Sequence, residues 1–558
     1  MENGEKGENT EIETLSLDEN DELPDDMKRI PPWKKQITIR GMIAGLFIGT
    51  IYSVVLMKLN LSIGIVPNLN VSAALLAFVF IRTWTKLLEK SNFTTTPFTR
   101  QENTVIQTCA VACYGLSYGG GFASFLLSLS RKIYEQAGVD TEGNSPTNLK
   151  EPELDWMMGF LFVVSFVGLV ALVPLRKMII IDYKLPYPSG TATALLINGF
   201  HTPKGDKMAK KQVRGFVKFS SFSFVWSFFQ WFYSGGEHCR FANFPTFGLR
   251  AWKQTFFFDF CMTYVGAGMI CSYLVNVSLL LGAVLSWDRT VMTESDDKDQ
   301  SAADVRRNEV YKRESIPLWV SCSGIFLSVF SVIIIPIMFP QLKWYHIAIV
   351  YVFAPSLSFC NAYETGLTDM NMSFNYGKVA LFVLAALGGE ENGVVAGLIG
   401  CGLVKSMVSI SSDLMQDMKT GHLTLTSPRA MLLSQAVGTA IGCVVAPLTF
   451  FIFYKAFDVG SPNSTYKAPY ALQGALRAHI SKHGDSWRGG LLLSASPLLA
   501  AVLRVFWVRR VGKPGEGRGT GAAREIRASP DGHGGAVPRW GVVCHRHVYR
   551  ELGGVCLE

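Results

Sequence analysis

The distribution of apolar and polar residues along the chain predicts a bundle of membrane-spanning helices. Nine segments are long, apolar and nearly free of Asp, Glu, Lys and Arg, with Asp259 as the single exception. They are 41–57, 66–81, 104–130, 156–175, 219–236, 256–287, 317–339, 344–363 and 430–454. About 20 helical residues cross a bilayer core, and backbone polar groups in lipid need internal partners. We therefore expect at least nine helical spans, and no β-barrel because strand alternation is absent.

Three further apolar pieces are interrupted by Pro, Gly or charged residues: 178–200, 379–389 and 392–404. We expect discontinuous or re-entrant helices there, since irregular backbone at membrane depth is tolerated where it lines a cavity. Basic residues flank 178–200 on both sides, so the positive-inside rule places both flanks, like the N-terminus, in the cytosol. A re-entrant hairpin satisfies this topology. The predicted fold class is all-α, a polytopic membrane helix bundle with discontinuous helices.

Composition and charge change this picture only at the two ends of the chain. Charged residues are 17% of the sequence, against about 25% in soluble proteins, which excludes a water-soluble enzyme. The net charge of +8 arises mostly after residue 470, where 13 Lys or Arg stand against 6 acidic residues. We expect no nucleic-acid partner. The chain divides into an acidic cytosolic terminus with a basic cluster at 1–36, a transmembrane domain at 37–470, and an Arg/Gly-rich tail at 471–558, whose composition predicts disorder.

No motif for catalysis or metal binding is present. The chain has 11 cysteines, and most lie in apolar runs, where cysteine behaves as a small hydrophobic residue. There is no CxxC pair, HExxH or GxGD, which argues against an intramembrane protease. A channel would show a repeated filter loop, and none is visible. We expect no cofactor and no metal ligands. The segment Cys544-His545-Arg546-His547 lacks a second pair to complete a site.

The segment 185–193 carries the clearest signal for a binding site. Two prolines, Pro186 and Pro188, stop one helix, and a new helix begins with Ser189 or Thr191 as its expected N-cap. The free N–H groups and the positive end of the helix dipole then face a ligand, for which an anionic carboxylate is the natural partner. An ordinary loop followed by a capped helix is the alternative.

Other polar segments interrupt the apolar runs, and ionisable groups inside a membrane are costly and mark functional sites. They lie at 101–108, 361–369, 389–392 and 413–422, and three glycines at 119–121 are expected to break a helix. The bland alternatives are hydrophilic loops, a helix-start charge for Glu102, an interfacial charge for Asp259 and a snorkelling Lys405. The candidates for the substrate pathway are Glu102, Asn103, Tyr187, Ser189, Thr191, Asn361, Glu364, Gln416 and Asp417. The candidates for proton coupling are Glu102, Asp259, Glu364 and Asp369.

Taken together, these motifs resemble the oligopeptide transporter superfamily, and most closely its plant yellow stripe-like branch. The resemblance covers roughly 28–470. It is carried by Pro31-Pro32-Trp33, Glu102-Asn103-Thr104, Tyr118-Gly119-Gly120-Gly121, Leu185 to Thr193, Asn361 to Asp369, Leu414-Met415-Gln416-Asp417 and Lys419-Thr420-Gly421. After Tyr470 this chain departs from the family pattern, in which further apolar spans follow.

The resemblance implies a secondary active transporter that takes up metal chelates with protons. Its expected partners are iron or another metal bound to nicotianamine or a related phytosiderophore, protons and membrane lipid, with a homo-oligomer among the compatible assemblies. The chelator holds the metal, so the protein needs no metal ligands. The plasma membrane is favoured over vacuolar or other internal membranes. The alternatives are an oligopeptide transporter and a truncated isoform that does not transport.

Overall fold

The computed structural model describes residues 31–233 and 316–471 apart from short gaps, with a few isolated residues between 248 and 311. The gaps are 63, 65, 67, 92–96, 138–148, 202–204, 462, 463, 465 and 467. Within these ranges the regular structure is entirely helical, and seven helices are long and apolar enough to cross a membrane. The predicted all-α membrane bundle is confirmed. Most of the predicted span 256–287, Asp259 and almost all of the predicted tail lie outside the described residues.

Six of the nine predicted runs correspond to candidate spans. They are α2 (Ile39–Ser62), α3 (Asn70–Lys90), α6 (Leu154–Ala171), α13 (Leu318–Met338), α14 (Trp344–Thr368) and α17 (Pro428–Ala456). A 3₁₀ turn, η4 (Val173–Leu175), prolongs α6, and a short helix, α1 (Trp33–Gln36), precedes α2. The run 219–236 falls in α8 (Gly205–Tyr233), which is not among the seven candidate spans.

The run 104–130 divides where its glycines predict a break. Helix α4 (Arg100–Gly119) ends at the first of them, and Gly121 takes a φ of +83, which a side chain would disfavour. The chain continues through a 3₁₀ turn, η2 (Leu127–Leu129), into α5 (Arg131–Ala137). Helix α4 is therefore followed by irregular backbone, and it is not among the seven candidate spans.

The interrupted pieces are partly as predicted. The stretch 178–200 is discontinuous, with a π-helical turn, η5 (Met178–Asp182), separated from α7 (Pro188–Phe200). A second break at Gly388 separates α15 (Ser373–Leu387) from α16 (Gly389–Leu423). The expectation of a separate piece at 392–404 is wrong, because α16 continues through it and through the polar stretch 413–422. Neighbouring helices surround α16 on all sides, so its polar residues find partners without ending the helix.

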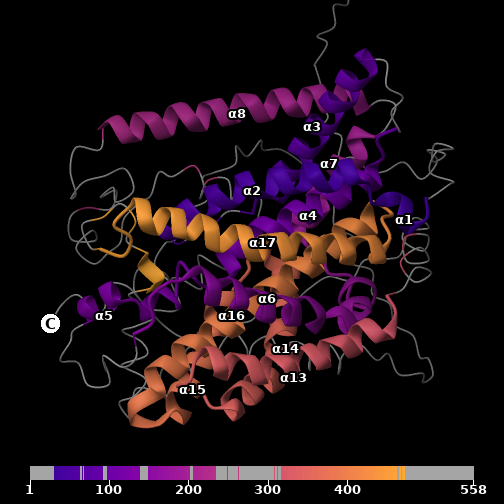
Figure 1. Cartoon of the computed structure of the whole chain (residues 1–558). Coiled ribbons are helices and arrows are strands. Elements are labelled where there is room, and N and C mark those ends of the chain that lie inside the picture. Colours follow the sequence, from indigo (N-terminus) through magenta and orange to yellow (C-terminus); the bar gives the residue numbers. More distant parts are fainter. Residues whose placement is uncertain are drawn as a thin grey trace, which may run out of the picture.

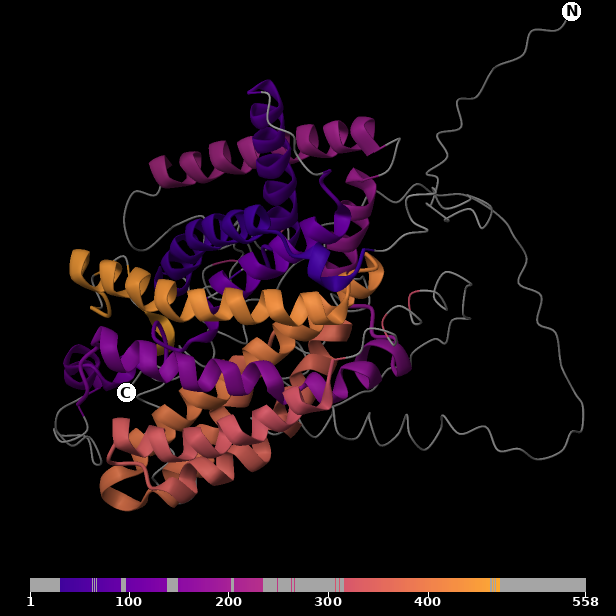
Figure 2. The same cartoon turned by 45° about the vertical axis from the view of Figure 1, so that its right-hand side comes forward.

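Helix α4 lies at the centre of one half of the bundle, packed against α2, α3, α17 and α16 (Figures 1 and 2). Glycines make these contacts close. A Cβ at Gly45 of α2 would lie 3.0 Å from Cys109 Cβ, and a Cβ at Gly438 of α17 would lie 2.4 Å from the Cys109 carbonyl oxygen. In the other half, α6, α14 and α15 pack around α16, and α13 packs against α6 and α14. Small residues let the backbones approach closely at these two helix pairs.

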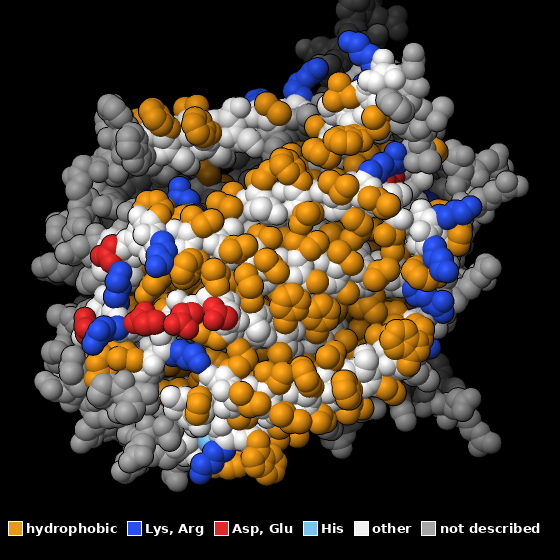
Figure 3. Space-filling model, in the orientation of Figure 1, with side chains coloured by type: hydrophobic (Ala, Val, Ile, Leu, Met, Phe, Trp, Pro, Cys, Tyr) orange, Lys and Arg blue, Asp and Glu red, His pale blue; other side chains and the backbone are white. Residues whose placement is uncertain are grey.

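Hydrophobic side chains cover the middle of the face shown in Figure 3, whereas charged side chains gather toward its two ends. The exposed apolar residues come from several candidate spans and include Ile43, Val79, Phe326, Val352 and Ile452. An apolar belt between two charged rims is the surface that a bilayer requires. The long axes of α2, α6 and α17 run from one rim toward the other (Figure 1).

Candidate functional site

Helix α7 begins at a strained turn that the end of α14 holds in place. The φ of Tyr187 is 43, in the left-handed region. Its backbone N–H donates to the carbonyl of Gly366 at 2.8 Å, and its hydroxyl donates to the carbonyl of Ala362 at 2.8 Å. Because Gly366 has no side chain, the buried Tyr187 ring can approach closely; a Cβ there would lie 3.1 Å from the ring. Tyr187 is thus an anchor for the start of α7.

The first turn of α7 is capped by a carboxylate from another helix. Asp369, the residue that ends α14, accepts from the Ser189 backbone N–H at 3.1 Å and from the Ser189 hydroxyl at 2.7 Å. The prediction that Ser189 or Thr191 caps α7 is wrong. The N-cap position is Tyr187, and the Thr191 hydroxyl donates back to the Pro186 carbonyl. The anionic group expected at this helix terminus is therefore present within the protein itself.

Asp369 experiences two opposing influences. Burial raises the pKa of its carboxyl group above the ordinary value, while the hydrogen bonds from Ser189 act to lower it. The positive end of the α7 dipole also favours the charged carboxylate. A proton on Asp369 would weaken its hold on α7. The N-terminal N–H of α7 would then be available to another anion.

Two amide side chains complete the site around the Ser189 hydroxyl. Gln416, on the central helix α16, donates to Ser189 Oγ and to Asp369 Oδ1, the latter at 3.1 Å. Asn68, in the segment before α3, donates to Ser189 Oγ at 3.0 Å. Thr420, one turn after Gln416, donates to the Gly190 carbonyl at 3.1 Å. Helices α7, α14 and α16 therefore meet at one polar centre.

A second polar group lies at the turn between α14 and α15. Asn371 donates to Asp413 Oδ1 at 3.3 Å and to Ser409 Oγ at 3.2 Å, both on α16. Asn361 donates to Asn371 Oδ1 at 3.1 Å and accepts from the Met372 N–H at 2.9 Å. Asn361 is buried, whereas Asn371 and Asp413 are half-buried. Asn361 thus fixes the turn that carries Asn371 to the Asp413 carboxylate.

A third polar group is enclosed between α4 and α16. Gln107 donates from Nε2 to Asp417 Oδ1 at 3.0 Å. Asn103 lies one turn earlier on α4, and all three side chains are fully buried. Gln416 and Asp417 are adjacent on α16, so neighbouring residues of one helix serve the α7 site and the α4 contact.

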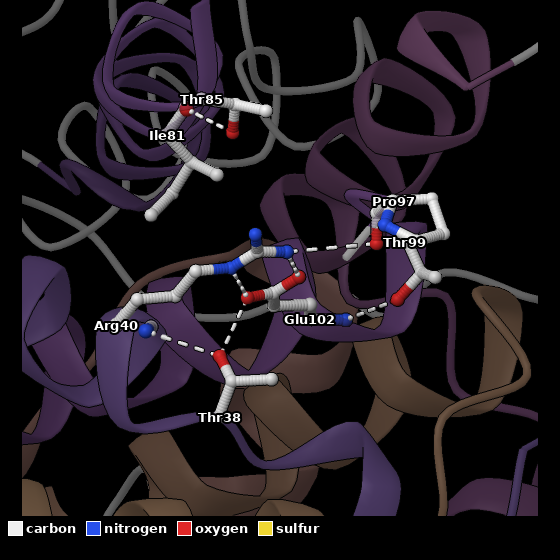
Figure 4. Close-up of polar contacts among 8 residues, drawn as sticks. Thr38, Arg40, Ile81, Thr85, Pro97, Thr99 and Glu102 are labelled. Carbon is white, nitrogen blue, oxygen red and sulfur yellow. Dashed lines mark hydrogen bonds and ion pairs between the residues drawn. The ribbon is translucent and has the colours of Figure 1, made fainter. Parts of the chain in front are cut away.

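Glu102 is bound by a cation at the start of α2. Arg40 donates from Nε and Nη2 to the two Glu102 oxygens, each at 2.7 Å, and the Thr38 hydroxyl donates at 2.5 Å (Figure 4). Thr99 caps α4 by accepting from the Glu102 N–H at 3.2 Å. This fork-to-fork pair ties α2 to α4. Glu102 therefore lies in an ion pair apart from the Ser189 centre.

The remaining candidates occupy separate positions. Glu364 accepts from the Tyr376 hydroxyl at 3.0 Å, which links α14 to α15. Lys405 does not snorkel to the membrane surface, as the bland alternative supposed. It is fully buried, donates to the Tyr118 carbonyl at 2.8 Å and to Ser124 Oγ at 3.0 Å, and lies 3.8 Å from the centre of the Phe374 ring. Asp259 lies outside the described residues.

The structure thus brings Ser189, Gln416 and Asp369 into direct contact. Among the participants that were not chosen from the sequence are Asn68, Asn371 and Asp413. Asp413 belongs to the polar stretch 413–422. Its position one helical turn before Asp417 is the signal that would have favoured Asp413 as a site residue. Nothing in the local sequence separates Asn68 or Asn371 from ordinary loop asparagines, because their partners are 121 and at most 42 residues away. Among the described residues, no three His, Cys, Asp or Glu side chains are grouped to hold a metal ion.

A membrane bundle whose broken helices meet at a buried polar centre is the architecture of many secondary transporters. The family model for the OPT oligopeptide transporter protein matches residues 36–293 and 288–514. The chain belongs to this family of multi-pass membrane proteins. The second matched range extends past residue 470, where the composition predicts the start of the tail; that boundary stays a prediction.

Several relatives are similar over most of the chain. The metal-nicotianamine transporter YSL3 of Arabidopsis thaliana is 60% identical over 531 aligned residues, covering 83% of this chain and 79% of the relative. The iron-phytosiderophore transporter YSL15 of Oryza sativa subsp. japonica is 51% identical, covering 80% and 76%. The iron-phytosiderophore transporter yellow stripe 1 of Zea mays is 51% identical, covering 87% and 81%.

Proposed function

We propose that this protein is a secondary active transporter that carries metal chelates together with protons. The substrates are iron, or another transition metal, bound to nicotianamine or a related phytosiderophore. Three relatives at 51–60% identity carry names that state such substrates. We propose the plasma membrane as the location, with vacuolar or other internal membranes as the alternative.

The observation that carries this proposal is the carboxylate of Asp369 bound at the start of α7. These chelators are rich in carboxylates, so a chelate carboxylate matches the group that already occupies the helix terminus. When Asp369 takes up a proton, its bond to the Ser189 N–H weakens and a substrate carboxylate can replace it. Proton uptake and substrate binding then favour each other at one site.

The side chains around this site suit a chelate better than a bare metal ion. Gln416 and Asn68 offer amide donors toward Ser189, and amides bind carboxylates without competing for the metal. The chelator keeps the metal coordinated throughout. Alternating access then requires only that the helices that meet here, α7, α14 and α16, change their mutual contacts.

The test is uptake of labelled iron–nicotianamine into proteoliposomes under an imposed pH gradient. We expect accumulation by the chain. With Asp369→Asn, which mimics the protonated carboxyl group, chelate binding at neutral pH should be no weaker and should depend less on pH. Uptake should be unchanged with the exposed Asp155→Asn. Excess unlabelled di- and tripeptides in the same assay test the oligopeptide alternative. A chimera in which the sequence after residue 470 is replaced by the corresponding part of YSL3 tests the alternative of a non-transporting isoform. Uptake by the chimera alone would favour that alternative. Uptake by neither protein would refute the proposal.

A further inference from the structure

The interface between α4 and α16 contains buried polar atoms that have no partner among the described residues. They are Asp417 Oδ2, Gln107 Oε1 and both polar atoms of the Asn103 side chain. The three residues are 0% exposed. Asn103 and Gln107 are four residues apart and lie on the same face of α4, and Gln107 contacts Asp417 directly. Buried polar groups normally find hydrogen bonds, so this group calls for a bound species.

The chemistry of these atoms selects that species. Three of the four unpartnered atoms are oxygens, one of them a carboxylate oxygen. A carboxylate enclosed in the bundle with a single amide donor is costly, and that cost falls when a proton or another small cation binds. A proton on Asp417 Oδ2 removes the charge and adds a donor to a place where two amide oxygens lack one.

No basic side chain replaces that cation in the described part of the chain. Arg40, on the neighbouring helix α2, is paired with Glu102 of α4. On α16, Lys405 binds Tyr118 and Ser124, and Lys419 lies two residues from Asp417 and so on roughly the opposite side of the helix. Other titratable or charged groups on the packed elements include Arg100, Tyr114 and Tyr118 of α4, Glu390, Glu391, Asp413 and His422 of α16, Asp369 at the end of α14, and Arg429 and Lys455 of α17. Tyr114 donates to Asn70, Asp413 accepts from Asn371, and Asp369 accepts from Ser189.

Asp417 is also the covalent neighbour of a residue in the proposed substrate site. Gln416 donates to Ser189 Oγ and Asp369 Oδ1, while Asp417 accepts from Gln107 on α4. Both residues belong to one uninterrupted helix. A change in the α4–α16 contact that moves Asp417 therefore also moves the Gln416 amide at the start of α7.

We propose that Asp417, assisted by Gln107 and Asn103, is a second binding site, beside Asp369, for a proton that drives transport. This inference rests on the proposed function. Oδ2 takes a proton from water on one side of the membrane. The carboxyl group stays neutral while the substrate-loaded protein changes from one access state to the other, and the proton then returns to water on the other side. The proposal places a coupling residue in the bundle interior. By contrast, the earlier candidates Glu102 and Glu364 are engaged by Arg40 and Tyr376.

The experiment separates substrate exchange from proton-driven accumulation in proteoliposomes. Asp417→Asn should retain exchange of labelled iron–nicotianamine at equal pH. It should lose at least about tenfold of the accumulation driven by a pH gradient, together with the proton flux that substrate evokes. Asp155→Asn, which removes an exposed carboxylate at the start of α6, should retain both. Accumulation and proton flux by Asp417→Asn at the wild-type level would overturn the proposal, as would wild-type accumulation that follows a Na⁺ gradient instead.

Two further measurements keep the test decisive. Gln107→Leu leaves the carboxylate but removes its donor, so the pH of half-maximal accumulation should rise; an unchanged pH profile would contradict the proposal. Infrared difference spectra of the purified protein, recorded against pH without substrate, should contain a carboxyl C=O band that Asp417→Asn lacks. Identical bands would overturn the proton site. If wild type neither exchanges nor accumulates the chelate, the proposed function fails, and the infrared result still decides the proton site.

Discussion

Asp369 and Ser189 belong to different helices, α14 and α7, yet the Asp369 carboxylate lies 3.1 Å from the Ser189 backbone nitrogen and 2.7 Å from its hydroxyl. This contact closes the N-terminus of α7 with a charge from 180 residues away. The broken helix is therefore part of the tertiary structure and depends on the end of α14.

The first prediction concerns the pH dependence of stability. Burial raises the pKa of Asp369 above 3.8, so the folded protein binds this proton at a pH where the unfolded chain has lost it. The contribution of Asp369 to stability is therefore largest at low pH and falls as pH rises from 3.8 through the raised folded pKa. Asp369→Asn should flatten this slope and leave the protein relatively more stable at neutral pH. Thermal unfolding of both proteins in detergent across pH checks this, and parallel pH profiles would contradict it.

The second prediction concerns the ion pair between Arg40 and Glu102 (Figure 4). Arg40→Met leaves a carboxylate whose side chain is 3% exposed without its cation, which costs about 3–5 kcal/mol in buried pairs. The double variant Arg40→Met/Glu102→Leu should recover most of the loss, because no unpaired charge remains. Unfolding temperatures of the two single variants and the double variant give the comparison. A double variant as unstable as Arg40→Met would show that the pair contributes through attraction instead.

The third prediction concerns helix packing at Gly438. A Cβ at this position would lie 2.4 Å from the Cys109 carbonyl oxygen and 2.7 Å from Ala112 Cβ, so Gly438→Ala must push α17 away from α4. Overpacking of this kind typically costs about 1–3 kcal/mol. Gly215→Ala in α8 is the matched control, because nothing lies within 4 Å of its added Cβ. Equal thermal stability of the two variants would mean that the α4–α17 contact yields at no cost.

The fourth prediction concerns the turn after α14. Asn361 makes three hydrogen bonds, with Asn371 Oδ1, the Met372 N–H and the Val408 carbonyl. Asn361→Leu keeps the volume but leaves the Met372 N–H without its partner, at a cost of about 1–3 kcal/mol. Asn371 Oδ1 and the Val408 carbonyl still accept from the Ser373 N–H and the Ser411 hydroxyl. We expect lower thermal stability and faster amide hydrogen exchange at 369–373. Exchange in this segment at the wild-type rate would show that the turn is held by other contacts.

The sequence was sufficient for the features that rest on local physics. Apolar length places α2, α6 and α17, and the three glycines end α4, because both properties act within one segment. It failed at α16, where Asp413 and Asp417 resemble loop residues. Whether such a stretch ends a helix depends on partners elsewhere in the chain, here Asn371 and Gln107, and local sequence does not contain that information.

The candidate site also has a part that local sequence predicts and a part that depends on distant residues. The break before α7 and the need for an anion at its N-terminus were predictable from Pro, Ser and Gly near residue 188. The identity of the anion was not, because Asp369 reaches Ser189 only through the left-handed turn at the end of α14, where its φ is 63. Arg40 is a similar case, since it reads as one member of a basic cluster until α2 is placed beside α4.

The position of α4 has a consequence for how the protein is made. This helix has too many polar residues to count among the candidate spans, yet every residue from Gln101 to Tyr114 is buried. Much of its cover comes from α17, which ends at Ala456, more than 300 residues later. A ribosome that has produced only α2, α3 and α4 therefore presents the membrane with a polar helix that α2 and α3 cover on one side only. The insertion machinery has to hold α4 until α16 and α17 have been synthesised, so the centre of the bundle is the last part to close.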